Sequence, residues 1–160
     1  MSCSVVASDV RTTPDAPVLD VERWATLAER AADLEGGQGE LTLTFVDPDE
    51  IADLNAEFMD KDGPTDVLSF PMDDEPVPGI PLLLGDIVVC PAVAVEQFEE
   101  HAGTLDDELA LLVVHGVLHI LGHNHADPGE AAVMRERESA LLSELHWGGP
   151  PPADFRHTHA

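Results

Sequence analysis

The spacing of apolar residues and of helix-starting residues predicts five helices. In residues 21–35 the apolar side chains recur every three or four positions and therefore share one face. An Asp or a Thr stands immediately before residues 21, 48, 105 and 128, where it can cap a helix, and Pro occupies positions 48, 91 and 128. We expect helices over residues 21–35, 48–58, 91–99, 105–121 and 128–145.

Three further segments have the pattern of strands. Residues 40–46 alternate apolar and polar side chains, and residues 66–71 and 82–90 are short apolar runs next to prolines. The N-terminal "SVVAS" can add an edge strand, whereas the acidic, Pro-rich residues 72–81 predict a loop. Helices and strands interleave without regular βαβ spacing, which predicts an α+β fold with a small mixed sheet.

The domain organisation expected from these patterns is a single domain. It spans residues 20–145, after an N-terminal segment 1–19 and before a flexible Pro- and His-containing tail at 146–160. Within the domain, residues 109–121 are apolar on nearly every side, interrupted only by His115, Gly116 and His119. A helix with this pattern is typical of a buried centre, so we expect a central helix that carries two histidines.

The charge of the chain limits its partners. The sequence has 32 Asp and Glu against 7 Lys and Arg, a formal net charge of −25. We interpret this excess as a solvated acidic surface, since no local patch points to a basic partner. Strong binding to naked nucleic acid, including DNA, is not expected, because such affinity comes from Lys and Arg displacing counterions.

The sequence also indicates where the protein works. It contains no apolar run of eighteen residues, so no membrane span is expected. The N-terminus lacks the basic and apolar pattern of a signal peptide, and the two cysteines are far apart with no CxxC pair. These features predict a reduced, cytoplasmic protein.

Half of the histidines gather in one stretch, "HGVLHILGHNH", at residues 115–125. His115 and His119 are one helical turn apart, and Gly122 lets the chain turn so that His125 can return to the same point. Metzincin proteases hold zinc with this spacing, H-x3-H-x2-G-x2-H. Three imidazoles leave one position open for water at a tetrahedral ion, so the sequence predicts one Zn²⁺ per chain with a catalytic zinc-bound water.

Two alternatives to this site remain open. Three separately hydrogen-bonded core histidines would each need a buried partner. His123 is the chief competitor of His125, but it directly follows the helix-ending glycine and has little chain with which to return. We therefore interpret His123 and Asn124 as neighbours of the ligands.

The residue after His115 argues against a protease. Zinc proteases of this type carry Glu directly after the first histidine as the general base, and this chain has Gly116 there. A glycine within a helix costs about 1 kcal/mol relative to alanine and supplies no base. A glycine next to a metal-binding histidine predicts that backbone or substrate approaches the helix closely at this point.

Three segments in order resemble one known family. "HGVLHILGHNH" is similar to the HGxLHLxGYDH or HGxLHLxGHDH signature of the YbeY endoribonucleases, the bacterial rRNA maturation factors. Residues 63–75, "GPTDVLSFPMDDE", resemble that family's PTDVLSFP block, and residues 84–94, "LGDIVVCPAVA", resemble its LGDIVI block. The resemblance covers roughly residues 40–145.

The resemblance implies a single α+β domain, with one zinc ion held by His115, His119 and His125. It implies metal-dependent cleavage of single-stranded RNA, in 16S rRNA 3′-end maturation and ribosome quality control. The partners would be ribosomal RNA and the small ribosomal subunit. The chain departs from the family at three positions: it has Met59 in place of an arginine, Asn124 in place of an Asp, and Gly103 where a histidine often precedes the long helix.

The sequence indicates the residues that assist catalysis or bind substrate less clearly than it indicates the metal ligands. Lys61 is the cation nearest the "PTDVLSF" block and Asp66 can act as a base, while Thr65 and Ser69 are candidates for substrate binding. The alternatives are a solvated loop lysine and polar side chains that bond local backbone. Two other functions stay open: a non-catalytic, zinc-stabilised ribosome-assembly factor, and a metallohydrolase of another substrate.

Overall fold

The computed structural model describes the chain except for residues 1–2, 14–15, 17, 73–76, 81 and 158–160. Residues 73–76 and 81 of the acidic loop expected at 72–81 therefore lie outside the described residues. The elements in chain order are β1 (Cys3–Asp9), α1 (Val21–Leu34), β2 (Gly39–Phe45), α2 (Pro48–Met59), β3 (Val67–Pro71), β4 (Leu83–Val89), α3 (Pro91–Gln97), the 3-10 turn η1 (Phe98–Glu100), α4 (Leu105–Ile120), α5 (Pro128–Leu142) and the π-helical turn η2 (Ser143–Trp147).

The sheet is mixed, as the sequence predicts. Its strand order is β1-β2-β4-β3, with β1, β2 and β4 parallel and β3 antiparallel to β4. The N-terminal strand β1 lies at one edge, which confirms the edge strand predicted from "SVVAS". No helix among the described residues is long and apolar enough to cross a membrane.

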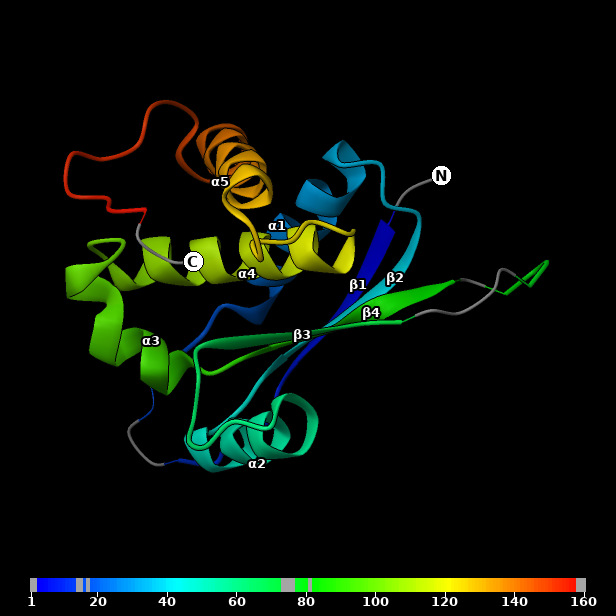
Figure 1. The fold of residues 1–160 in the computed structure, drawn as a ribbon, viewed down its shortest axis with the longest axis horizontal. Helices are drawn as coiled ribbons and strands as arrows, with labels where there is room; N and C mark the ends of the chain where they lie inside the picture. Colours follow the sequence, from blue (N-terminus) through cyan, green and yellow to red (C-terminus); the bar gives the residue numbers. More distant parts are fainter. Residues whose placement is uncertain (1–2, 14–15, 17, 73–76, 81, 158–160) are drawn as a thin grey trace.

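Helices cover both faces of the sheet (Figure 1). Helices α1 and α4 pack on one face and α5 packs against the outside of α4, while α2 lies on the opposite face. The larger core fills the space between the sheet and α1, α4 and α5. A smaller cluster around Ile51, Leu68 and Val88 joins α2 to the other face.

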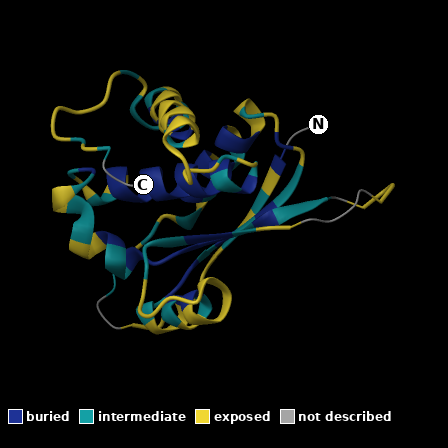
Figure 2. Cartoon of the chain, in the orientation of Figure 1, coloured by how far each residue is buried: buried dark blue, intermediate teal, exposed yellow. Residues whose placement is uncertain are grey.

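Helix α4 is the buried centre of the molecule (Figure 2). Every residue from Asp107 to Leu118 is buried, which confirms the central helix predicted from the apolar run. Its first turn is capped by the Thr104 hydroxyl, which accepts a hydrogen bond from the Asp107 N–H at 3.1 Å. A buried helix with fixed ends gives the histidines on it a rigid support.

Gly116 allows α4 to approach the sheet closely. A Cβ atom at this position would lie 2.7 Å from the Ile87 Cγ2 of β4, closer than two carbon atoms can pack. The predicted close approach is therefore made by the Ile87 side chain.

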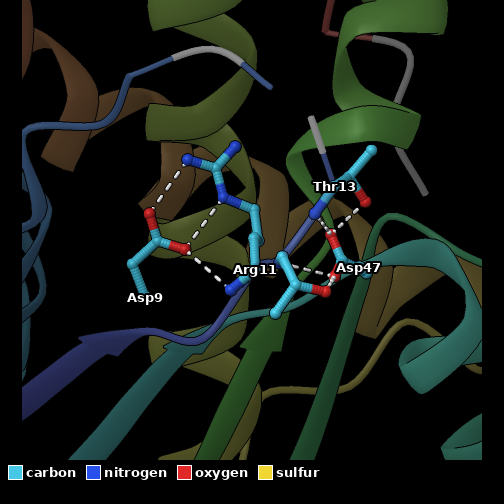
Figure 3. A network of polar contacts seen from close by, with 5 residues as sticks. Asp9, Arg11, Thr13 and Asp47 are labelled. Atoms are coloured by element: carbon cyan, nitrogen blue, oxygen red, sulfur yellow. Dashed lines mark hydrogen bonds and ion pairs between the residues drawn. The ribbon is translucent and has the colours of Figure 1, made fainter. Parts of the chain in front are cut away.

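Asp47 does not cap α2 with its side chain, unlike the cap expected there. Its carboxylate accepts hydrogen bonds from the N–H and hydroxyl groups of Thr12 and Thr13, which follow β1 (Figure 3). The Thr13 hydroxyl bond, with the other three, lowers the pKa of Asp47 to about 2. Asp47 therefore joins the segment after β1 to the start of α2. The caps expected at Asp20 and Asp127 are present.

Several residues of the C-terminal segment contact the helical layer or one another. Asp107 of α4 accepts hydrogen bonds from His146 Nε2 at 2.7 Å and from Trp147 Nε1 at 2.9 Å. The ring of Phe155 packs edge-on against Trp147, with 4.7 Å between ring centroids. His146 and Trp147 are thus held against α4 and Phe155 against Trp147, while residues 150–154 are exposed.

Candidate metal centre

The structure brings together the three histidines grouped by the sequence motif. His115 and His119 lie one turn apart on α4, with ring centroids 6.4 Å apart. Gly122 has a φ of 104°, a left-handed conformation open to glycine, and turns the chain back after the helix. The His125 ring then lies 5.4 Å from that of His115 and 6.1 Å from that of His119.

Hydrogen bonds set the orientation of two of these imidazoles. His115 Nδ1 lies 2.7 Å from Glu138 Oε2, and His119 Nδ1 lies 2.9 Å from the backbone oxygen of His123. Both partners are acceptors, so each Nδ1 carries the proton and each Nε2 keeps its lone pair. A metal-binding histidine has this arrangement, since its second nitrogen donates to a carboxylate or carbonyl.

Glu138 is a site residue that the sequence reasoning missed. It lies on α5, is 2% exposed, and shares the buried face of that helix with Met134, Leu141 and Leu142. An acid at an apolar position of an amphipathic helix was the available signal. Burial raises the pKa of Glu138, but hydrogen bonds from His115 and His157 lower it further and hold it at about 2. The side chain is therefore a carboxylate at neutral pH.

The two residues expected to neighbour the ligands have different places. His123 contributes its backbone oxygen, while its ring faces α1, with Nε2 3.8 Å from Glu35 Oε1. Asn124 Oδ1 accepts a hydrogen bond from the Ala126 N–H at 2.9 Å, which closes a local turn. His123 thus orients His119 through the main chain, and Asn124 shapes the turn that leads to His125.

The histidine rings converge but stand wider than a metal would hold them. In the part of the chain that the structure describes, no group of three or more His, Cys, Asp or Glu is arranged to hold a metal ion. Three imidazoles on a tetrahedral zinc, with Zn–N of about 2.1 Å, would have ring centroids about 5 Å apart. The three centroid distances would have to shorten by about 0.4–1.4 Å. The donor set and the Nδ1 partners fit zinc.

Asp66 is not brought to the histidines. Its carboxylate accepts hydrogen bonds from the Val67 N–H at 2.7 Å and from Gln97 Nε2 at 2.8 Å. Gln97 also donates to the buried Glu108, which lies seven residues before His115 on α4, about 10 Å along the helix. Asp66 therefore joins β3 and α3 to the N-terminal end of α4.

The other helper candidates are spread over the molecule. Ser69 is the one beside the motif, with Oγ 3.5 Å from the Gly116 oxygen. Thr65 contacts Asp66, and Lys61 is exposed in the turn after α2, the helix on the opposite face of the sheet from α4. Met59, at the end of α2, is 38% exposed. A positive side chain from the "PTDVLSF" region is thus not placed at the three histidines.

Comparison with known proteins finds relatives that share one name, Endoribonuclease YbeY. The chain is 50% identical over 115 residues to Endoribonuclease YbeY of Nocardia farcinica, a match that covers 67% of this chain and 62% of that protein. It is 49% identical over 115 residues to Endoribonuclease YbeY of Rhodococcus erythropolis, covering 67% and 63%. The matches therefore span less than two thirds of the length of these relatives.

A solved structure and a family model extend the comparison to most of the chain. The solution structure of a Thermotoga maritima protein superposes with a TM-score of 0.59 at 30% identity, covering 89% of this chain and 90% of that one. The model of the family described as Endoribonuclease YbeY matches residues 11–146, which include all three histidines. The chain belongs to the YbeY endoribonuclease family.

Proposed function

We propose that the protein is a zinc-dependent endoribonuclease that cleaves single-stranded RNA. In this proposal it acts in the cytoplasm on ribosomal RNA and the small ribosomal subunit, in 16S rRNA 3′-end maturation and ribosome quality control. The observation that carries the proposal is the convergence of His115, His119 and His125, two of them held by acceptors at Nδ1. Membership of an endoribonuclease family supports the same reaction class.

His115, His119 and His125 would hold the zinc ion through Nε2. A bound zinc ion supplies a Lewis acid that polarises a phosphodiester oxygen and the attacking water. The three side chains form a gradient of exposure, from buried His115 through His119 to exposed His125. Substrate would therefore approach from the His125 side, while Glu138 and the His123 carbonyl keep the inner imidazoles in place.

A second candidate function is a ribosome-assembly factor in which zinc only stabilises the fold. Two observations favour it: Met59 replaces the arginine of the family pattern, and three of the seven cations are engaged in ion pairs with acids, namely Arg11, Arg23 and Arg137. Both leave little positive charge to stabilise a phosphoryl transition state. A metallohydrolase of another substrate is the third candidate.

One assay separates the endoribonuclease from the other two candidates. Purified protein is incubated with single-stranded RNA carrying a 16S 3′-end sequence and with the matching duplex, with and without chelator, and with His119→Ala in parallel. We expect cleavage of the single strand that is lost with chelator, restored by zinc and absent in the variant. Zinc binding without cleavage would favour the assembly factor or another substrate, and cleavage unaffected by His119→Ala would refute the site.

The third ligand is decided by a matched pair of variants. We expect His125→Ala to lose zinc and His123→Ala to keep it, because the His123 contact to His119 is made by a backbone oxygen that alanine retains. Metal content and zinc affinity are the measurements. Affinity should fall on acidification, since protons compete with the metal for the imidazole nitrogens. Zinc kept by His125→Ala and lost by His123→Ala would overturn the assignment.

A further inference from the structure

The second oxygen of Glu138 is held by a residue of the C-terminal segment. While Oε2 accepts from His115, Oε1 lies 2.9 Å from His157 Nε2. The other nitrogen of His157, Nδ1, lies 3.2 Å from the Ser139 hydroxyl. One neutral tautomer satisfies both contacts: Ser139 donates to Nδ1, and Nε2–H donates to Glu138.

The path of the chain brings His157 to this position. The Arg156 N–H donates to the His101 oxygen at 2.9 Å, and Phe155 packs on Trp147. Gly103, with a φ of 96°, lies against Asp154, and a Cβ at residue 103 would come within 2.9 Å of the Asp154 backbone oxygen. Contacts of residues 154 and 156 therefore fix the backbone on both sides of Phe155. This places the next side chain, His157, beside α5.

We propose that His157 is a positioning residue for the metal centre. It fixes the Glu138 carboxylate, which in turn fixes the Nδ1–H tautomer and the orientation of His115. The proposal rests on the proposed function for its metal. It assigns the C-terminal segment, which lies beyond the residues matched by the family model, a role in the site.

The physical reason is the cost of an under-bonded buried carboxylate. Glu138 is 2% exposed, so a lone pair on Oε1 that loses His157 cannot be satisfied by bulk water. The carboxylate would then rotate to share its remaining donor between both oxygens, and the His115 ring would lose its fixed direction. Partners of metal-binding histidines typically change metal affinity by 10–100-fold when they are removed.

The test compares two substitutions of one residue. His157→Leu removes the donor, whereas His157→Gln places an amide N–H near the position of Nε2 and keeps it. Arg156→Gln is the matched control, since Arg156 is exposed in the same segment. Zinc affinity is measured by competition with a chelating dye. The His115 Nδ1–H resonance is followed by NMR in the full-length, metal-free protein.

We expect His157→Leu to weaken zinc binding about three- to tenfold, less than the 10–100-fold expected of Glu138→Gln, a direct partner of the ligand. His157→Gln and Arg156→Gln should stay within about twofold of wild type. The His115 Nδ1–H resonance should be sharp in wild type and His157→Gln and broadened by exchange with water in His157→Leu.

The outcomes separate this proposal from the one it rests on. Zinc affinity and an Nδ1–H signal unchanged in His157→Leu would overturn the role of His157 and leave the metal site intact. Equal losses in His157→Leu and His157→Gln would also overturn it, because the retained donor would then have no effect. A wild-type protein that binds no zinc would refute the metal site, and the NMR comparison would still test the link through Glu138.

Discussion

At the scale of single residues, the hydrogen bonds of each imidazole decide what it can do. His115 and His119 use Nδ1 on acceptors of the protein, which leaves Nε2 with its lone pair. His146 does the reverse, because its Nε2 is bonded to the Asp107 carboxylate at 2.7 Å. The same residue type is therefore prepared for metal binding at the end of α4 and used for packing at its start.

The lowered pKa of Asp47 predicts that the stability of the folded protein depends on pH. Its pKa is about 2 in the folded protein against an ordinary value of 3.8, so it contributes stability that is present above about pH 4. That contribution falls as the pH drops from about 4 to 2 and is gone only below the folded pKa of about 2, where the carboxylate is protonated in both states. We expect Asp47→Asn to lower the Tm at pH 7 and the difference from wild type to shrink toward pH 2.

Asp49→Asn is the control, since it removes an equal charge from an exposed position in the same helix turn. Thermal melts of all three proteins between pH 7 and pH 2 provide the comparison. A Tm difference for Asp47→Asn that is constant over this range would mean that the bonds from Thr12 and Thr13 do not depend on the charge.

At the scale of elements, the packing of α4 on the sheet positions His115 and His119, two of the proposed metal ligands. The helix comes close to Ile87 of β4 at Gly116, which lies between His115 and His119 in sequence. It is also bonded to β3 through Ser69, whose hydroxyl lies 3.5 Å from the Gly116 oxygen. A change in this contact would move both histidines relative to Glu138 on α5.

Gly116→Ala is predicted to destabilise the protein despite its better helix propensity. Alanine gains about 1 kcal/mol in a helix, whereas overpacking a core costs typically about 1–3 kcal/mol. The new Cβ would lie 2.7 Å from Cγ2 of Ile87, a fully buried side chain. We expect a net loss of up to about 2 kcal/mol in unfolding free energy, together with weaker zinc binding.

Gly129→Ala serves as the comparison, because residue 129 is an exposed position in the first turn of α5. It should be neutral or slightly stabilising. The combination of Gly116→Ala with Ile87→Ala should cost less than the sum of the single changes, since the clash is then removed. Strict additivity of the two changes would show that this contact does not limit the packing of α4.

At the scale of the whole molecule, the acidic charge limits how the protein can bind RNA in the function proposed above. The net charge is −25, and Arg11, Arg23 and Arg137 are paired with Asp9, Asp106 and Glu35 at 2.7–3.1 Å. Few cations are then available for phosphate contacts. We expect selection of the substrate to come from docking on the ribosomal subunit.

Weak, nearly salt-insensitive binding to naked RNA is the measurable consequence. Each phosphate neutralised on a single strand contributes a slope of about −0.7 to log K against log salt, so two contacts would give about −1.4. Titration of a short single-stranded RNA at several salt concentrations measures this slope, and co-sedimentation with the small subunit measures docking. Tight binding with a slope steeper than about −4, equivalent to six contacts, would refute the expectation.

The sequence by itself determined the elements of the fold and the histidine motif. Periodicity and caps placed each helix within a few residues, because these signals act over one or two turns. Two elements end differently: the helix expected over 91–99 becomes α3 and η1, and the one expected to reach 145 ends at Leu142 and continues as the π-helical turn η2. The spacing of His115, His119 and His125 is also local, so the sequence was sufficient to group them.

Only the tertiary structure decided the partners of these local features. Glu138 reaches His115 from 23 residues away and His157 reaches Glu138 from 19 residues away. Asp47 binds Thr12 and Thr13 from 34–35 residues away. The partner of Asp66 is also distant in sequence, because Gln97 donates hydrogen bonds to both Asp66 and Glu108. This bridge places Asp66 near Glu108 and not at the histidines. A single sequence contains no periodic signal for such pairs, because a buried hydrogen bond depends on which helix faces which, and the packing of α4, α5 and the C-terminal segment decides that.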